Sequence, residues 1–249
     1  MLTANFRFYE ELNDFLPPGR RGVAFDCPCA QAATVKHMIE ALGVPHTEVE
    51  LLLVNGVSVD FAYLLQDGDR VAVYPMFEAF DVSPLLRVRT QPLRVLRFVA
   101  DAHLGGLARL LRMAGFDTLY DNNFNDGEIA AIAERQQRIV LSRDRELLKR
   151  RNITHGCYLH TIKPAQQLRE LYERLDLARS ARPFTLCLHC NAPLHAVAKA
   201  EVLDRIPPRV RAYYEVFSLC DACQRVFWQG SHWQRMRALL NELSDPPFT

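Results

Sequence analysis

Arg94-Val-Leu-Arg-Phe-Val-Ala100-Asp101 is the stretch that decides the fold of the larger part of this 249-residue chain. A short apolar run that ends in an acid predicts a buried β-strand. A helical pattern follows from about Leu104 to Ala114 and stops at Gly115, where a glycine is a common end for a helix. A strand followed closely by a helix is typical of a parallel α/β sheet.

Moving outward along the chain, the same alternation repeats through residues 93–180. We expect three further strands, each with a helix after it, and the last helix begins at Pro164, a residue suited to the first turn. The predicted strands are Thr118–Tyr120, Arg138–Leu141 and Cys157–His160, and the predicted helices begin near Asp126, Arg145 and Pro164. These residues therefore predict one α/β domain.

The front of the chain has a different order: strand, strand, helix, strand, strand, strand. Thr34 is placed to cap the helix and Gly43 to end it. Asn55-Gly56 lies between apolar alternations and predicts a hairpin turn, because both residues tolerate positive φ. We expect an α+β β-grasp domain over residues 1–80, with its second strand at Val23–Phe25, and a linker over 81–92 containing Ser83-Pro84 and Gln91-Pro92.

Charge divides unevenly between these parts. Residues 1–90 hold 7 Lys/Arg against 12 Asp/Glu, a balance of −5, and residues 91–249 hold 23 against 17, a balance of +6. A basic domain suits a polyanionic partner, although two ordinary surfaces would also differ by chance. The apolar stretches are too short and too charged for a membrane span, and the first residues lack a secretion signal. We therefore expect a cytoplasmic protein.

Four cysteines follow the predicted α/β domain as two Cys-x2-Cys pairs: Cys187, Cys190, Cys220 and Cys223. In a reducing compartment, paired cysteines of this kind bind metal more often than they form disulfides. Four thiolates are the tetrahedral set that structural Zn²⁺ prefers, with no position left for catalysis. The pattern predicts a zinc ribbon over residues 181–240. Redox cysteines remain an alternative, and His189, His195 and His232 are possible substitute ligands.

Acids follow three successive predicted strands: Asp101, then Asp126 with Glu128, then Asp144. The carboxyl ends of parallel strands are where function gathers in open α/β sheets. Converging carboxylates favour Mg²⁺ or Mn²⁺, which activates water and polarises a phosphodiester, and Arg143 is placed to stabilise the developing charge. Each acid also has a structural interpretation, since Asp126 and Asp101 both stand where a helix N-cap is needed.

Several cationic and aromatic side chains are candidates for contact with a nucleic acid. Arg109 and Arg112 lie three residues apart on the first helix, and Arg145 follows the third acid. His232 stands beside Trp233, and two aromatic pairs, Tyr213-Tyr214 and Phe227-Trp228, offer rings that stack on bases. Solvated helix faces and packing around the ribbon are the competing interpretations.

These motifs resemble a known family. Residues 101–117, the Asn125-Asp-Gly-Glu128 segment and Ile139-Val-Leu-Ser-Arg-Asp144 are similar to the PIN-like RNase domain named from the C-terminus of the exonuclease mut-seven. The two cysteine pairs and Gly230-Ser-His-Trp233 resemble the zinc ribbon of that family. The resemblance implies a PIN fold in which Asp101, Asp126 or Glu128, and Asp144 bind a catalytic metal. PIN nucleases often carry a fourth acid, and His160-Thr161 stands in its place here.

Residues 1–80 resemble the ubiquitin-like domain that precedes this RNase domain in many bacterial members. Their Gln66-to-Pro75 segment is also similar to small sulfur-carrier proteins of ubiquitin fold. Those carriers react through a free C-terminal Gly-Gly, whereas here the chain continues beyond Pro75. We therefore interpret the front domain as an adaptor that binds protein or RNA.

Three functions remain open from the sequence. The first is a metal-dependent endoribonuclease that acts on single-stranded RNA, with structural zinc and catalytic Mg²⁺ or Mn²⁺. The second is a non-catalytic adaptor that binds RNA or the ribosome, suggested by the missing fourth acid. The third is a scaffold that recruits a protein partner through the ubiquitin-like domain.

Overall fold

A computed structural model describes residues 1–75, 87–88 and 96–244 of the protein. The chain divides into two compact units, each made of two segments: residues 1–96 with 125–159, and residues 97–124 with 160–249. Residues 125–159 of the predicted α/β domain thus pack with the β-grasp residues, and the domain bounds expected from the sequence stay a prediction. The predicted linker over 81–92 lies outside the described residues, except for Arg87 and Val88.

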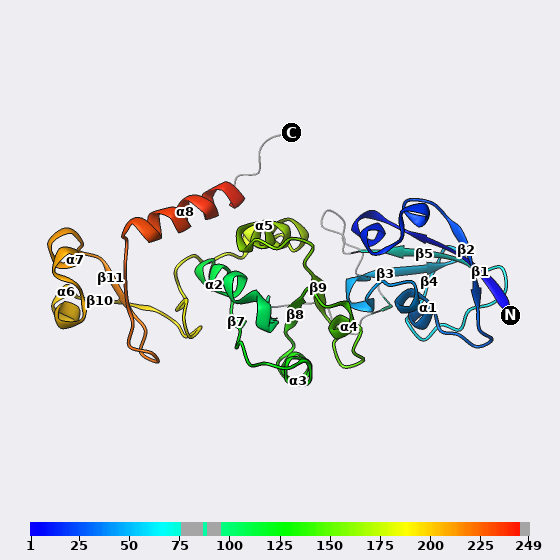
Figure 1. The fold of residues 1–249 in the computed structure, drawn as a ribbon, viewed down its shortest axis with the longest axis horizontal. Helices are drawn as coiled ribbons and strands as arrows, with labels where there is room; N and C mark the ends of the chain where they lie inside the picture. Colours follow the sequence, from blue (N-terminus) through cyan, green and yellow to red (C-terminus); the bar gives the residue numbers. More distant parts are fainter. Residues whose placement is uncertain (76–86, 89–95, 245–249) are drawn as a thin grey trace. The chain divides into compact units, whose positions relative to one another are not determined.

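The first unit opens with a five-stranded sheet in the order β2-β1-β5-β3-β4. The parallel pair β1–β5 lies at its centre, and the pairs β1–β2, β3–β5 and β3–β4 are antiparallel. This is the β-grasp arrangement that the sequence predicts, with helix α1 beside the sheet (Figure 1). Its elements are β1 (Leu2–Phe8), β2 (Phe25–Cys29), α1 (Val35–Ala41), β3 (Leu51–Val54), β4 (Val57–Ser58) and β5 (Arg70–Tyr74).

Local signals place most of these elements. The Thr34 hydroxyl accepts a hydrogen bond from the N–H of His37 (3.2 Å), and Gly43 ends the helix at φ 100°. Asn55 and Gly56 both have positive φ, 53° and 84°, as the hairpin turn requires. The predicted second strand is wrong, because β2 begins at Phe25. Pro28 is tolerated inside β2 because this strand lies at the edge of the sheet.

The rest of the first unit consists of α3 (Asp126–Gln136), β8 (Ile139–Ser142), α4 (Arg145–Leu148) and β9 (Gly156–Tyr158). Strands β8 and β9 pair in parallel. Strand β9 packs against the 3-10 turn η3 (His46–Glu48) of the β-grasp part. A Cβ on Gly156 would lie 2.6 Å from the Leu148 side chain and 3.1 Å from the Thr47 hydroxyl, so any larger residue here would have to displace these side chains.

The second unit begins with β6 (Phe98–Ala100), η5 (Ala102–Leu104), α2 (Gly105–Met113) and β7 (Thr118–Leu119). Strands β6 and β7 pair in parallel, and α2 packs against α5 (Pro164–Arg174). Gly115 ends α2 at φ 90°, and a Cβ there would lie only 2.0 Å from the Arg182 carbonyl oxygen. The chain that leads into the cysteine region therefore runs directly over the end of α2.

An antiparallel three-stranded sheet, β10-β11-β12, completes the second unit. Its small apolar core centres on Val202, Ile206, Val210 and Phe217. Two short helices and a 3-10 turn connect β10 to β11 and lie beside the sheet in Figure 1. The elements are β10 (His195–Val197), α6 (Lys199–Val202), η7 (Leu203–Arg205), α7 (Pro208–Tyr213), β11 (Phe217–Leu219), β12 (Val226–Trp228) and α8 (Ser231–Ser244).

The predicted fold class is confirmed: an α+β ubiquitin-like domain precedes an α/β region whose strands pair in parallel, and the four cysteines come together near the C-terminus. Within the described ranges, no helix combines the length and the apolar character that crossing a bilayer demands.

Candidate zinc centre and candidate catalytic acids

Two turns of matching geometry carry the four cysteines. In each turn, the N–H of the first cysteine (Cys187 or Cys220) donates to the carbonyl five residues later, at 2.8 Å and 3.0 Å. The residue four positions on, Asn191 or Gln224, donates back to that cysteine's carbonyl at 3.0 Å and 2.7 Å. Asn191 and Gln224 both have positive φ, 70° and 58°. The backbone thus forms the same loop twice, although the two sequences share only their cysteines.

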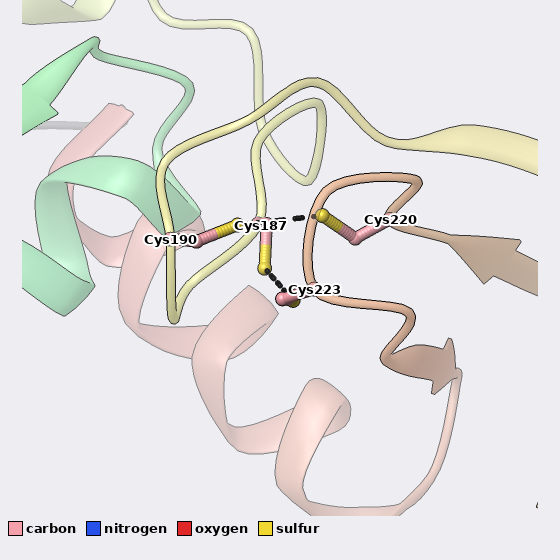
Figure 2. A group of neighbouring side chains, drawn as sticks. All are labelled: Cys187, Cys190, Cys220 and Cys223. Atoms are coloured by element: carbon pink, nitrogen blue, oxygen red, sulfur yellow. Dashed lines mark hydrogen bonds between the residues drawn. The ribbon is translucent and has the colours of Figure 1, made fainter.

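The four thiols point toward one another (Figure 2). The Sγ atoms of Cys187 and Cys223 lie 3.6 Å apart, those of Cys190 and Cys220 lie 3.4 Å apart, and all four lie within 4.8 Å of one another. A tetrahedral Zn²⁺ with Zn–S bonds of about 2.3 Å needs sulfurs about 3.8 Å apart. The arrangement therefore fits a four-thiolate zinc site that leaves no open coordination position.

Burial raises the pKa of the Cys187 thiol to about 12 in the metal-free fold. A hydrogen bond from the backbone N–H of Cys190 acts in the opposite direction but is the smaller effect. Because zinc binds the thiolate, it must displace a proton from this sulfur, and its binding is coupled to pH.

Arg112 joins this centre to helix α2. The Arg112 side chain is buried, and its guanidinium donates to the carbonyls of Thr118 (2.9 Å), Leu188 (3.2 Å) and His189 (2.8 Å). Desolvation by burial lowers its pKa, and nearby Cys187 opposes that shift. Arg112 thus holds the first cysteine turn against β7, and the structure does not support its predicted contact with RNA.

Asn191 forms a second link between the same elements. Its amide donates to the Asp117 carboxylate (2.6 Å), and its carbonyl oxygen accepts from the N–H of Thr118 (2.9 Å). Sequence reasoning did not identify either this asparagine or the role of Arg112. The available signal was an asparagine directly after the second cysteine, at a position where a turn needs positive φ.

Asp101 directly follows β6, as predicted. One carboxylate oxygen accepts from the N–H of Ala102 at 2.6 Å, and the other lies 3.3 Å from Nδ1 of His103. The carboxylate therefore caps the short turn η5, which is the structural interpretation that the sequence left open.

Asp126 and Glu128 lie in the first turn of α3. The predicted cap at Asp126 is wrong, because Asn125 caps this helix and Glu128 completes a reciprocal capping box with it (2.9 and 3.1 Å). The half-exposed Asp126 carboxylate lies 3.4 Å from the Arg150 guanidinium. Glu128 therefore has a structural role, whereas Asp126 keeps an accessible carboxylate.

Asp144 is the exposed N-cap of α4, and its carboxylate accepts from the N–H of Glu146 at 2.8 Å. Next to it, Arg143 is half-buried. Arg145 lies with its guanidinium carbon 4.9 Å from the centre of the Phe15 ring and 5.4 Å from that of Tyr158. This double stacking places Arg145 against the β-grasp part and leaves its predicted contact with RNA without geometric support.

The structure brings together only part of the predicted metal-binding set. Among the described residues, the four cysteines are the one group of three or more candidate ligands whose atoms gather closely enough for an ion. Asp101 belongs to the second compact unit, and Asp126, Glu128 and Asp144 belong to the first. A shared Mg²⁺ or Mn²⁺ among these acids stays a prediction.

Two predicted nucleic-acid contacts are accessible. Arg109 is exposed on α2, and His232 is exposed in the first turn of α8. His232 also lines a hollow between α7, β12 and α8, together with residues of both aromatic pairs.

These features define an α/β protein with a ubiquitin-like front domain and a four-cysteine ribbon tied to its α/β part. Comparison with family models agrees: the Mut7-C RNAse domain model matches residues 96–240, and the Mut7-C ubiquitin model matches residues 1–81. The chain belongs to the Mut7-C RNAse domain family, as its sequence motifs predict.

Two solved structures of a small archaeal modifier protein, SAMP1 of Haloferax volcanii, are similar to part of the chain. One has 19% identity and a TM-score of 0.25 over 30% of this chain and 98% of its own. The other has 18% identity and a TM-score of 0.26 over 31% and 99%. Comparison with curated proteins gives no match.

Proposed function

We propose that this protein is a ribonuclease that hydrolyses RNA phosphodiester bonds with the help of Mg²⁺ or Mn²⁺ bound by Asp101, Asp126 and Asp144. The observation that carries the proposal is the match of residues 96–240 to an RNase-domain family, with an acid in the segment that follows each of the first three predicted strands. We further propose single-stranded RNA as the substrate, endonucleolytic cleavage, and the cytoplasm as the site of action, where thiolate zinc sites persist.

The chain's own residues would bind and orient the RNA. Carboxylate oxygens are the ligands of hard divalent cations, and such an ion lowers the pKa of a bound water for attack on phosphorus. Arg150, 3.4 Å from Asp126, would hold that carboxylate in place. Arg143 follows β8 beside Asp144 and would stabilise negative charge on the phosphate.

Asparagine substitutions separate catalysis from folding. Asp101 and Asp144 cap turns through one carboxylate oxygen, and asparagine caps as well as aspartate does. Asp101→Asn and Asp144→Asn should therefore keep the fold but lower Mg²⁺- or Mn²⁺-dependent RNA cleavage by more than about 100-fold. A residue that only hydrogen-bonds to a metal ligand typically costs about 10- to 100-fold when it is replaced, so the loss of a direct metal ligand should exceed that range. A gel assay with a labelled single-stranded RNA measures this, and circular dichroism checks the fold.

Glu134→Gln is the matched control, because Glu134 is exposed at the opposite end of α3 from Asp126. It should cleave RNA at the rate of the unmodified protein. Undiminished cleavage by both aspartate variants would eliminate the proposed mechanism.

A second candidate function is a non-catalytic adaptor that binds RNA or the ribosome, with a protein partner at the ubiquitin-like domain. The observation in its favour is that Asp101, Glu128 and Asp144 all accept backbone hydrogen bonds at turns. It predicts RNA binding without cleavage under any divalent metal.

A further inference from the structure

The ribbon carries a hollow that the zinc site does not use. Six rings contribute to its walls, from the chain before the first cysteine turn, from α7, from β12 and from α8; this aromatic groove comprises Phe184, Tyr213, Tyr214, Phe227, Trp228 and Trp233. Its volume is about 660 Å³, within the range of roughly 300–1,000 Å³ typical of sites for small ligands.

One wall of the aromatic groove is fixed by packing. Tyr214 and Trp228 pack against the apolar core of the ribbon. The rings of Trp233 and Phe184 lie 5.0 Å apart at an angle of 32°, and the Arg237 guanidinium lies 5.1 Å from the Trp233 ring centre. At the rim, by contrast, Tyr213 is 80% exposed. The exposed Tyr213 ring, beside aromatic side chains that are fixed by packing, offers a flat π-surface to a ligand.

The stretch of chain that supplies most of the groove is basic. Residues 205–237 contain six arginines and only two acids, Glu215 and Asp221, a balance of +4. The lining itself includes Arg209 and His232 and no acidic side chain. Aromatic rings next to cations suit a ligand that has both a flat base and a phosphate.

We infer that the aromatic groove binds an unpaired nucleobase of an RNA strand, with Arg209 and His232 facing the adjoining phosphates. The inference rests on the proposed function for the choice of RNA. Every nucleobase has a π-face, so stacking here is tolerant of sequence, and the contact is lost when the base is paired. The groove thereby makes the ribbon the part of the protein that selects single-stranded RNA.

The chain contains two tryptophans, and both line the aromatic groove. Their fluorescence therefore reports directly on its occupancy. The zinc-loaded full-length protein is titrated, without added divalent metal, with a single-stranded oligoribonucleotide, with the same strand in a duplex, and with inorganic polyphosphate. The single strand should quench the emission, whereas the duplex and the polyphosphate should leave it nearly unchanged.

Tyr213→Ala should weaken binding of the single strand about 10-fold, the effect of losing one base–aromatic stack. Tyr213→Phe should restore it, because the ring is retained. Val216→Ala is the matched control, since Val216 is a nearby exposed apolar residue that does not line the groove; its affinity should stay unchanged.

Three results would overturn the inference: equal affinity of Tyr213→Ala and unmodified protein, equal quenching by polyphosphate, or quenching by an aromatic peptide but not by RNA. These outcomes are independent of the nuclease proposal. If the unmodified protein cleaves RNA with a divalent metal and Tyr213→Ala binds the single strand as tightly as the unmodified protein, the groove inference is rejected and the nuclease proposal stands. Ring-dependent quenching without any cleavage supports the groove and rejects the nuclease.

Discussion

At the scale of single residues, Arg112 shows how a charged side chain can act wholly inside the fold. It is only 4% exposed, and its guanidinium completes three hydrogen bonds to carbonyls of β7 and the first cysteine turn. Arg112→Ala leaves those carbonyls without their donor, and a buried charge-assisted set of this kind is worth about 3 kcal/mol. We expect that loss of stability in urea unfolding of the zinc-loaded protein.

Arg109→Ala provides the matched control, three residues earlier on the same helix and exposed. Its free energy of unfolding should stay within about 0.5 kcal/mol of the unmodified protein, as is usual for surface substitutions. Equal stability of the two variants would show that the Arg112 contacts contribute nothing.

Sequence reasoning placed Arg109 and Arg112 on one helix but could not separate their roles. Both are arginines in the same amphipathic pattern, and the difference is a contact to residues about 76 positions further along the chain. The acids show the same limit. Their positions after strands follow from the local pattern, whereas the capping geometry of Asp101 and Asn125 depends on backbone angles.

At the scale of elements, the two cysteine turns are the best-predicted feature, because metal-ligand spacing is a local property of the sequence. The aromatic groove is the opposite case. Its walls come from Phe184, Tyr213 and Trp233, which are brought together only when α7 and α8 lie beside the ribbon sheet. The two aromatic pairs were visible in the sequence, but their common surface was not.

We expect the zinc affinity of the two cysteine turns to depend on pH in a defined direction. Because burial raises the Cys187 pKa to about 12 in the metal-free fold, this sulfur is a thiol at neutral pH without zinc. Zinc displaces that proton, so the metal affinity should rise with pH by about tenfold per pH unit for each proton released. Competition with a chromogenic chelator between pH 6 and 8 measures the slope.

Cys220→Ser is the companion variant, since it removes one ligand from the second turn and keeps its size. It should lower the zinc content and the melting temperature. Because Arg112 and Asn191 connect the first cysteine turn to α2 and β7, these two elements should also lose stability. Full zinc retention in Cys220→Ser, or an unchanged melting temperature of this variant, would contradict a structural zinc site.

At the scale of the whole molecule, the ubiquitin-like part shares a compact unit with residues 125–159 of the chain. The N–H of Tyr158 donates to the Glu48 carboxylate, and Arg145 stacks on both Phe15 and Tyr158. The order of strand and helix patterns predicts two parts, and their net charges differ in sign. This order could not predict the contact, because the residues that form it lie about 110 positions apart.

His46 is the residue through which this coupling can be tested. It is 5% exposed, with Nδ1 2.7 Å from the Glu40 carboxylate and Nε2 2.9 Å from the Ile153 carbonyl. His46→Ala leaves that buried carbonyl without a donor and opens a gap between η3 and the chain before β9. Hydrogen exchange should therefore quicken in residues 139–158 as well as around residue 46.

His37→Ala controls for the loss of an imidazole, since His37 lies exposed on α1. It should leave exchange in residues 139–158 as it is in the unmodified protein. Faster exchange confined to the β-grasp residues of His46→Ala would mean that the two parts open independently. Faster exchange both in the β-grasp residues and in residues 139–158 would mean that the two parts open as one cooperative unit. A partner that binds the ubiquitin-like domain would then also stabilise the segment that carries Asp144, because binding to one part of a cooperative unit stabilises the rest.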